Sequence, residues 1–168
     1  MRINPELIAR HYSAAPVPGA VDVEPIIPAV EAVGDLRDAF AVLNDWTERY
    51  QYIIDMGQRL KTLPPELCTE EHRLRGCQSQ VWLIMTYHAP RLYMHAASDA
   101  LIVNGLIALM AQVYNGRTPD EILRQGPDFI GDLGLGDHLS PGRKNGLFAL
   151  IEAIQTVAAH VKRQSEAA

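Results

Sequence analysis

The sequence predicts an α+β domain in which helices cover one face of a small three-stranded antiparallel sheet. Apolar residues recur every three or four positions over 35–60, which is typical of an amphipathic helix. They alternate with their neighbours over 81–96, as they do in strands, and helical spacing returns after residue 98. A helix, then strands, then several helices is an element order typical of this fold class.

Length and charge limit the class of protein. The chain has 168 residues, of which 48% are hydrophobic, so one domain with its own core is expected. Its 15 basic and 20 acidic side chains give a formal net charge of -5, which argues against nucleic-acid binding. No apolar run approaches the ~20 residues needed to cross a membrane, and the N-terminus lacks a signal-peptide pattern. We expect a soluble cytoplasmic protein with protein or small-molecule partners; the sequence leaves homodimer formation open.

Proline shapes the start of the chain, where five of the 11 prolines occur before residue 30. Each proline fixes one backbone dihedral and removes a hydrogen-bond donor, which disfavours long regular elements. We expect a short helix over 5–12 within a partly ordered N-terminal extension, residues 1–34. The main domain is expected over 35–163, followed by a C-terminal tail over 164–168.

A single long helix is predicted from Asp35 to Leu60. Asp35 is expected to be its N-cap, and Pro64 prevents its continuation. The aromatic residues of this helix could form a ligand-stacking surface, but aromatic side chains at helical spacing more often pack in a core. We therefore interpret these residues as packing residues: Trp46, Tyr50 and Tyr52.

Two antiparallel strands are predicted over 81–88 and 92–96, joined by a turn that contains Pro90. A third strand is expected over 73–75. Cys77 would then lie in the loop between the first and second strands. Loops carry function while the strands beside them hold their ends in place, so this position suits a mobile thiol.

Helices are predicted for most of the chain after the strands. Three of them have a residue at the start that can accept a hydrogen bond from the first turn: Ser98, Thr118 and Ser140. The first of these helices should end at Asn115-Gly116. A short helical turn is expected over 129–133, inside a glycine-rich segment.

Cys77 is the principal candidate for chemistry. It follows Gly76, which tolerates backbone angles that other residues avoid, and precedes Gln78 and Ser79, which offer hydrogen bonds in the loop. By spacing alone, a small buried apolar residue is the more common fate of a free cysteine. The other cysteine, Cys68, forms no CxxC or zinc pattern with it, so both thiols are expected to be free in a reducing compartment.

Three segments, in one order along the chain, carry a family resemblance. They are Gly76-Cys77-Gln78-Ser79-Gln80-Val81-Trp82, then Ser98-Asp99-Ala100, then His138-Leu139-Ser140-Pro141 with Arg143, Gly146 and Leu147. Together they resemble the SufE family over roughly residues 39–160. The proline-rich N-terminal extension of this chain has no counterpart in the motif-bearing core of that family.

The resemblance implies a persulfide carrier for iron-sulfur cluster assembly. SufE proteins accept sulfur from cysteine desulfurases of the SufS or CsdA type, and Cys77 matches their sulfur-accepting cysteine. The family shares its fold with IscU-like scaffold proteins. The carried sulfur goes on to a downstream iron-sulfur scaffold, and the carrier itself requires no cofactor and no bound metal. Gly76, Gln78, Ser79 and Asp99 are then candidates for loop control and partner contact.

Other functions stay open at this point. An IscU-like cluster scaffold would share the fold, although two cysteines supply few of the ligands that a cluster needs. An independent cysteine-dependent redox enzyme or hydrolase would need a base beside the thiol. We expect instead a component of a sulfurtransferase that depends on its partner.

Other site assignments stay open as well. Arg73 and Arg75 could activate Cys77 by charge, His138 could act as a base, and Cys68 could act as a resolving thiol. The simpler interpretations are solvated charges for the two arginines, a structural role for His138 and a partly exposed free thiol for Cys68. Helix capping is likewise a sufficient explanation of Asp99.

Overall fold

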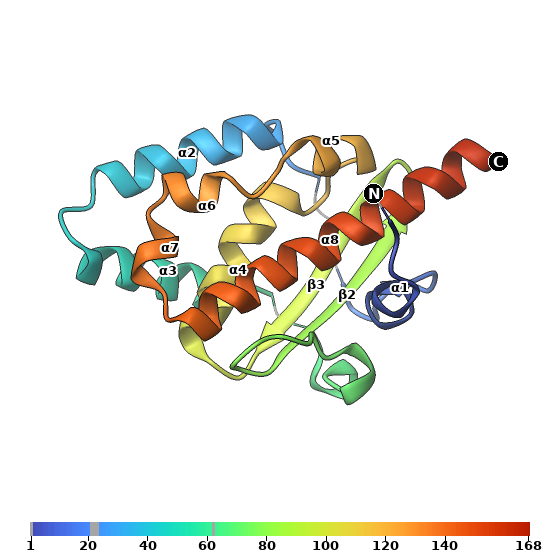
Figure 1. Cartoon of the computed structure of the whole chain (residues 1–168), viewed down its shortest axis with the longest axis horizontal. Coiled ribbons are helices and arrows are strands. Elements are labelled where there is room, and N and C mark those ends of the chain that lie inside the picture. The colour runs from blue at the N-terminus through green and yellow to red at the C-terminus, as the bar shows by residue number, and fades with distance from the viewer. Residues whose placement is uncertain (1, 21–23, 62) are drawn as a thin grey trace.

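The computed structural model describes residues 2–20, 24–61 and 63–168. The chain forms an α+β fold in which helices surround a three-stranded sheet (Figure 1). In chain order the elements are α1 (Pro5–His11), β1 (Tyr12–Ser13), α2 (Ala29–Ala41), α3 (Trp46–Arg59), the 3₁₀ turns η1 (Pro65–Leu67) and η2 (Glu70–His72), β2 (Val81–His88), β3 (Arg91–Ser98), α4 (Leu101–Tyr114), α5 (Pro119–Arg124), α6 (Phe129–Asp132), α7 (Leu135–His138) and α8 (Pro141–Ala167).

The sheet is mixed rather than antiparallel throughout. Strands β2 and β3 form the predicted antiparallel hairpin, from Val81 opposite Ser98 to His88 opposite Arg91. The third strand is β1, which pairs in parallel with β2 and comes from the N-terminal extension. The expected strand over 73–75 is therefore wrong. Only an isolated bridge joins Arg73 to Trp82 there, because the chain turns away at Gly76, whose φ is +86°.

The long helix predicted over 35–60 is two helices. Helix α2 ends at Ala41, and Asp45 caps α3 by accepting a hydrogen bond of 2.9 Å from the backbone N–H of Glu48. Asp35 lies inside α2 and is not an N-cap. The apolar spacing persists through both helices because both face the same core, so the spacing alone did not reveal the break.

The predicted helix starts have mixed outcomes. Thr118 and Ser140 cap α5 and α8 through the backbone N–H groups of Glu121 and Arg143, as expected. Ser98 does not cap α4, because Ala100 holds that position without a side-chain hydrogen bond. The short helices α1 and α6 occur where the sequence predicted them, and α4 ends just before Asn115-Gly116. Helix α8 runs to Ala167, through the expected tail.

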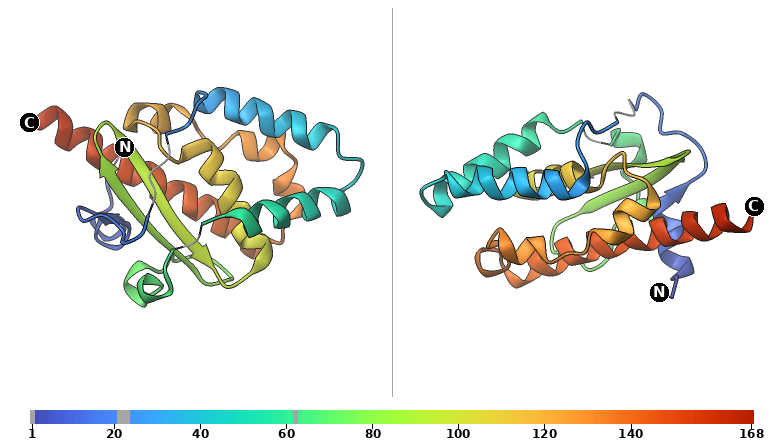
Figure 2. Two further views of the ribbon diagram at one scale, coloured as in Figure 1. Left: turned by 180° about the vertical axis from the view of Figure 1, so that it is seen from behind. Right: turned by 90° about the horizontal axis from the view of Figure 1, so that it is seen from above.

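The main core lies between one face of the hairpin and the helices. Leu83 and Met85 of β2 are completely buried against α4 and α8, and α8 crosses the sheet diagonally (Figure 1). The opposite face carries a smaller cluster built from Val17, Leu63, Ile84 and Ala97. Val17 and Ala20 bring the end of the described range 2–20 onto this second face, which lies on the side of the sheet away from α8 (Figure 2). The sheet is thus covered on both faces.

Candidate functional site

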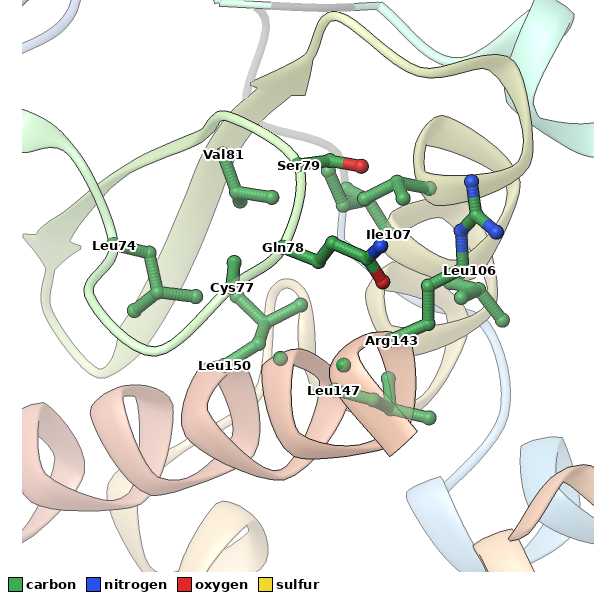
Figure 3. Close-up of a pocket in the computed structure, with 13 residues that line it drawn as sticks. Leu74, Cys77, Gln78, Ser79, Val81, Leu106, Ile107, Arg143, Leu147 and Leu150 are labelled. Carbon is green, nitrogen blue, oxygen red and sulfur yellow. The ribbon is translucent and has the colours of Figure 1, made fainter. Parts of the chain in front are cut away.

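The loop that carries Cys77 spans residues 75–80, and both of its ends lie beside the start of β2. The backbone N–H of Leu74 donates a hydrogen bond of 2.7 Å to the carbonyl oxygen of Val81. Arg73 forms an isolated bridge to Trp82 directly below. These contacts close the stem of the loop. Gly76 makes a left-handed turn directly before Cys77, and the loop lies against α8 (Figure 3).

The tip of the loop lies on two glycines of α8. A Cβ at Gly146 would be 2.9 Å from Sγ and 3.3 Å from Cβ of Cys77, so the thiol occupies the space that a side chain would fill. One turn earlier, a Cβ at Gly142 would be 2.5 Å from Oε1 of Gln78. Ser140 also donates a hydrogen bond of 3.4 Å to that oxygen. Glycines four residues apart therefore form the seat of the loop. Gly142 lies between the motif residues Pro141 and Arg143, and no sequence motif had indicated it.

The far end of the loop is held by the start of the segment after β3. Asp99 accepts a hydrogen bond of 3.1 Å from the backbone N–H of Gln80, and the hydroxyl of Ser98 donates one of 2.7 Å to the carbonyl oxygen of Gln80. Asp99 therefore contacts the loop and lies outside α4, where Ala100 holds the capping position, so helix capping does not account for it. Both ends of the loop are tied, and only its middle rests on α8.

A cavity of about 20 Å³ lies beside Cys77, large enough for about one water-sized group. Its walls come from the loop and from two helices (Figure 3). Most of the lining side chains are apolar: Leu74, Val81, Val103, Leu106, Ile107, Leu147 and Leu150. Ser79 and Gln78 complete the loop side. Arg143 also lines the cavity, and its Nε is buried without an acceptor among the described residues.

Burial controls the ionisation of Cys77. Desolvation raises the pKa of its thiol to about 11, from a reference value of 9.0, because the thiolate loses hydration in this apolar setting. The nearby positive charge of Arg73 opposes this shift but does not offset it. Cys77 is partly exposed, and in this arrangement its thiol is mostly protonated at neutral pH, which makes it a poor nucleophile.

Comparisons with known proteins identify this arrangement. The sequence model of the SufE family, described as an Fe-S metabolism associated domain, matches residues 34–158. The chain belongs to the SufE family. It is 40% identical over 134 residues to an uncharacterized SufE-like protein of Rhizobium meliloti (strain 1021), covering 76% of this chain and 94% of that one. Family membership indicates a role in Fe-S metabolism.

A solved structure shows the same fold. The solution structure of a hypothetical protein from Thermus thermophilus superposes with a TM-score of 0.66 at 20% identity. The match covers 80% of this chain and 97% of that one. At this level of identity the likeness concerns the arrangement of the elements. It agrees with the α+β architecture that the sequence motifs of the SufE family implied.

The second cysteine of this SufE protein lies on the other side of the sheet. Cys68 packs with the cluster around Ile84 and Trp82, whereas Cys77 packs with the main core. The Cys68 thiol lies 3.6 Å from the carbonyl oxygen of Pro64, and burial raises its pKa. Both cysteines are free. A sheet between the thiols opposes the alternative in which Cys68 resolves Cys77.

The remaining candidates separate into two groups. Arg73 acts on Cys77 by charge, whereas Arg75 forms an ion pair of 3.4 Å with Glu6 of α1. His138 stacks on Trp46 with ring centroids 3.9 Å apart, which gives this histidine a packing role.

Within the described residues there is no group of three metal-ligating side chains, and no helix there is long and apolar enough to span a membrane.

Proposed function

We propose that this protein takes persulfide sulfur from a cysteine desulfurase onto Cys77 and delivers it for iron-sulfur cluster assembly. The observation that supports this most directly is the position of Cys77, on a loop tied at both ends and seated against a small apolar cavity. One additional sulfur atom on Cys77 is a group of the size that this cavity admits. A carrier needs a thiol that can reach its donor and then shelter the sulfur it receives.

The transfer needs no oxidant or reductant. The Cys77 thiolate attacks the terminal sulfur of the partner's cysteine persulfide, and a new S–S bond forms at Cys77. The partner's S–S bond breaks, and its electron pair leaves on the partner's cysteine as a thiolate. The transferred sulfur keeps its oxidation state. The Cys77 proton passes to solvent or to the partner as the thiolate forms.

Loop opening is the step that makes this reaction available. A thiol with a pKa of about 11 is almost fully protonated near pH 7, so Cys77 in the closed loop is a poor nucleophile. An open loop returns the thiol to water and brings it within reach of a partner. Closing the loop again places the loaded sulfur against the apolar side chains of α4 and α8. We place this cycle in the reducing cytoplasm, where both cysteines stay reduced.

Two alternatives have less support. A cluster scaffold needs several ligands together, but Cys68 and Cys77 pack on opposite faces of the sheet. An independent cysteine enzyme needs an activated thiol, whereas burial of Cys77 suppresses its ionisation. We therefore propose a partner-dependent component of a sulfurtransferase, with a desulfurase of the SufS or CsdA type as donor and an iron-sulfur scaffold as acceptor.

Mass spectrometry after incubation with a cysteine desulfurase and cysteine tests the proposal. We expect one reductant-sensitive sulfur on Cys77, none in Cys77→Ser, and normal loading in Cys68→Ser. The protein should also raise desulfurase turnover and release no sulfide from cysteine alone. Sulfur found on Cys68, or sustained sulfide release by the isolated protein, would contradict the proposal.

A further inference from the structure

Helix α1 lies outside the family-matched residues and yet contacts the stem of the Cys77 loop. The match to the SufE family begins at residue 34, whereas α1 spans Pro5–His11. Helix α1 packs against α8, β2 and η2, beside the strands in Figure 1. Strand β1 continues directly from it and pairs with β2, and the ring of Tyr12 meets that of His160 edge-on at 5.5 Å. The sheet and α8 therefore fix where α1 lies.

Arg10 is the residue of α1 that reaches the loop stem. One nitrogen of its guanidinium donates to the carbonyl oxygen of Glu70 at 2.9 Å and to that of Arg73 at 3.2 Å. The side chain is only 16% exposed, and its hydrogen bond to Arg73 is partly buried, whereas the one to Glu70 is exposed. In the other direction, Nδ1 of His72 lies 2.9 Å from the carbonyl oxygen of Arg10. Helix α1 and the segment before the loop are thus joined by reciprocal contacts.

The contact with Arg73 acts on the residue where the loop begins. Arg73 bridges to Trp82, and the adjoining hydrogen bond from Leu74 to Val81 closes the stem. The side chain of Arg73 also supplies the positive charge that favours the Cys77 thiolate. A terminal guanidinium nitrogen carries two N–H groups in a fixed plane, so it can donate to two carbonyl groups at once. Arg10 therefore constrains the backbone at the residue whose side-chain charge acts on the thiol.

A second contact from α1 reaches the loop itself. Glu6 lies 3.4 Å from Nε of Arg75 and also 3.4 Å from Nε of Arg10. Arg75 and Glu6 are both mostly exposed, so their ion pair contributes little by itself. The ion pair nevertheless shows that α1 contacts the loop at Arg75 as well as at its stem. Arg10 carries the larger effect because its hydrogen bond to Arg73 is partly buried.

We propose that Arg10 is a positioning residue for the sulfur acceptor: it holds the stem of the Cys77 loop and thereby limits how often the loop leaves its seat on Gly142 and Gly146. This inference rests on the proposed function in one respect, that Cys77 is the reacting thiol. It assigns a role to a helix that precedes the family-matched residues.

Selective thiol alkylation tests this role. The variant Arg10→Met keeps an unbranched apolar side chain but removes the hydrogen-bond donors. Arg10→Lys keeps the positive charge but loses the planar guanidinium group. Arg37→Met is the matched control, because it removes a guanidinium that pairs with Asp132 on a different part of the surface. Mass spectrometry follows the iodoacetamide modification of Cys77 and Cys68 in the same molecules, with the unfolding free energy measured for each variant.

We expect Cys77 to react about tenfold faster in Arg10→Met, because hydrogen bonds from a charged donor hold the closed stem. Arg10→Lys should give an intermediate rate, and Arg37→Met the wild-type rate. Cys68 should react at an unchanged rate in all three variants, because it lies on the other face of the sheet. If Arg10→Met does not fold, the Cys77 rate in Arg10→Lys decides the question.

Two results would overturn the inference. One is a wild-type Cys77 rate in the folded Arg10 variants. The other is an equal acceleration of Cys68 and Cys77, which would show general loosening of the domain. Failure of the proposed function is distinguishable, because it appears as absence of sulfur loading in the wild-type protein, whereas the alkylation rates need no desulfurase.

Discussion

The thiol of Cys77 lies directly against the backbone of Gly146, in the volume where any other residue would place its Cβ. Gln78 and Gly142 repeat this relationship one helical turn earlier. The closed loop thus depends on side chains that α8 lacks. Hydrogen bonds at Gln80 and at the stem tie its ends, whereas close packing on glycine positions its centre.

Replacing Gly146 with alanine should open the loop. The added Cβ would overlap Cys77 Sγ at 2.9 Å, and the tied ends let the loop tip move without unfolding α8. We expect Cys77 to be alkylated several-fold faster. Gly34→Ala in α2 is the control, because a Cβ there meets nothing within 4 Å. The control should gain up to about 1 kcal/mol in unfolding free energy and keep the wild-type thiol rate. An unchanged Cys77 rate in Gly146→Ala would show that the helix yields instead.

The reactivity of Cys77 should keep rising to unusually high pH. Its pKa of about 11 implies a thiolate fraction of about one in 10⁴ at pH 7. The pKa of Cys77 is raised above 9.0 in the folded state. The contribution of the protonated thiol to the free energy of unfolding is therefore present below pH 9 and is lost as the pH rises toward 11. The alkylation rate of the Cys68→Ser protein, measured from pH 7 to 11, checks this. A plateau at or below pH 9 would contradict burial of the thiol.

Removing the carboxylate of Asp99 should loosen the far end of the loop. Asp99→Ala deletes the acceptor for the backbone N–H of Gln80. We therefore expect faster alkylation of Cys77 and faster loss of sulfur from the loaded protein. Asp55→Ala, which deletes an exposed acceptor of Gln51, is the control. Helix α4 should keep its stability, because Ala100 occupies the capping position. Loss of helix stability with an unchanged thiol rate would return Asp99 to the capping role.

Gly105→Ala should be strongly destabilising. A Cβ on Gly105 of α4 would overlap the carbonyl oxygen of Ile53 in α3, and a Cβ on Gly57 would lie 2.5 Å from the backbone nitrogen of Gly105. The two helices meet backbone to backbone, so neither can yield by changing a rotamer. We expect a loss of about 3 kcal/mol or more in urea unfolding. A loss below that of an ordinary surface substitution would mean that the helices can separate at little cost.

The free energy of unfolding should decrease on acidification because of His11. This side chain is completely buried, with Nδ1 2.9 Å from the carbonyl oxygen of Leu83 and Nε2 without a partner among the described residues. Burial lowers its pKa below 6.5; the Leu83 hydrogen bond opposes this, and the charges of Arg10 and His72 reinforce it. The folded state therefore binds fewer protons than the unfolded state at acidic pH. The stability is present above pH 6.5 and is lost as the pH falls below it.

His11→Gln tests that assignment, because glutamine keeps a donor for Leu83 and does not titrate. Urea unfolding at several pH values between 5 and 8 should show a smaller decline on acidification than in the wild type. His88→Gln, at the exposed end of β2, is the control for replacing a histidine on the surface. An identical decline in His11→Gln and wild type would assign the pH dependence to other groups.

The sequence by itself determined the features that depend on neighbours along the chain. Alternation over 81–96 predicted the hairpin, and the hydroxyls of Thr118 and Ser140 predicted two helix starts. These succeed because strand period and capping act over a few residues. Cys77 could also be selected before the fold was known, on the strength of its motif.

Tertiary structure decided the rest. Only the folded chain places Asp99 on Gln80, Gly146 under Cys77 and Arg10 on Arg73. The same holds for β1, which takes the edge of β2 that the sequence had assigned to residues 73–75. Each of these contacts joins segments that no local period relates. Their partners are chosen by packing and by the need of buried polar groups for hydrogen bonds, and both act across space and not along the chain.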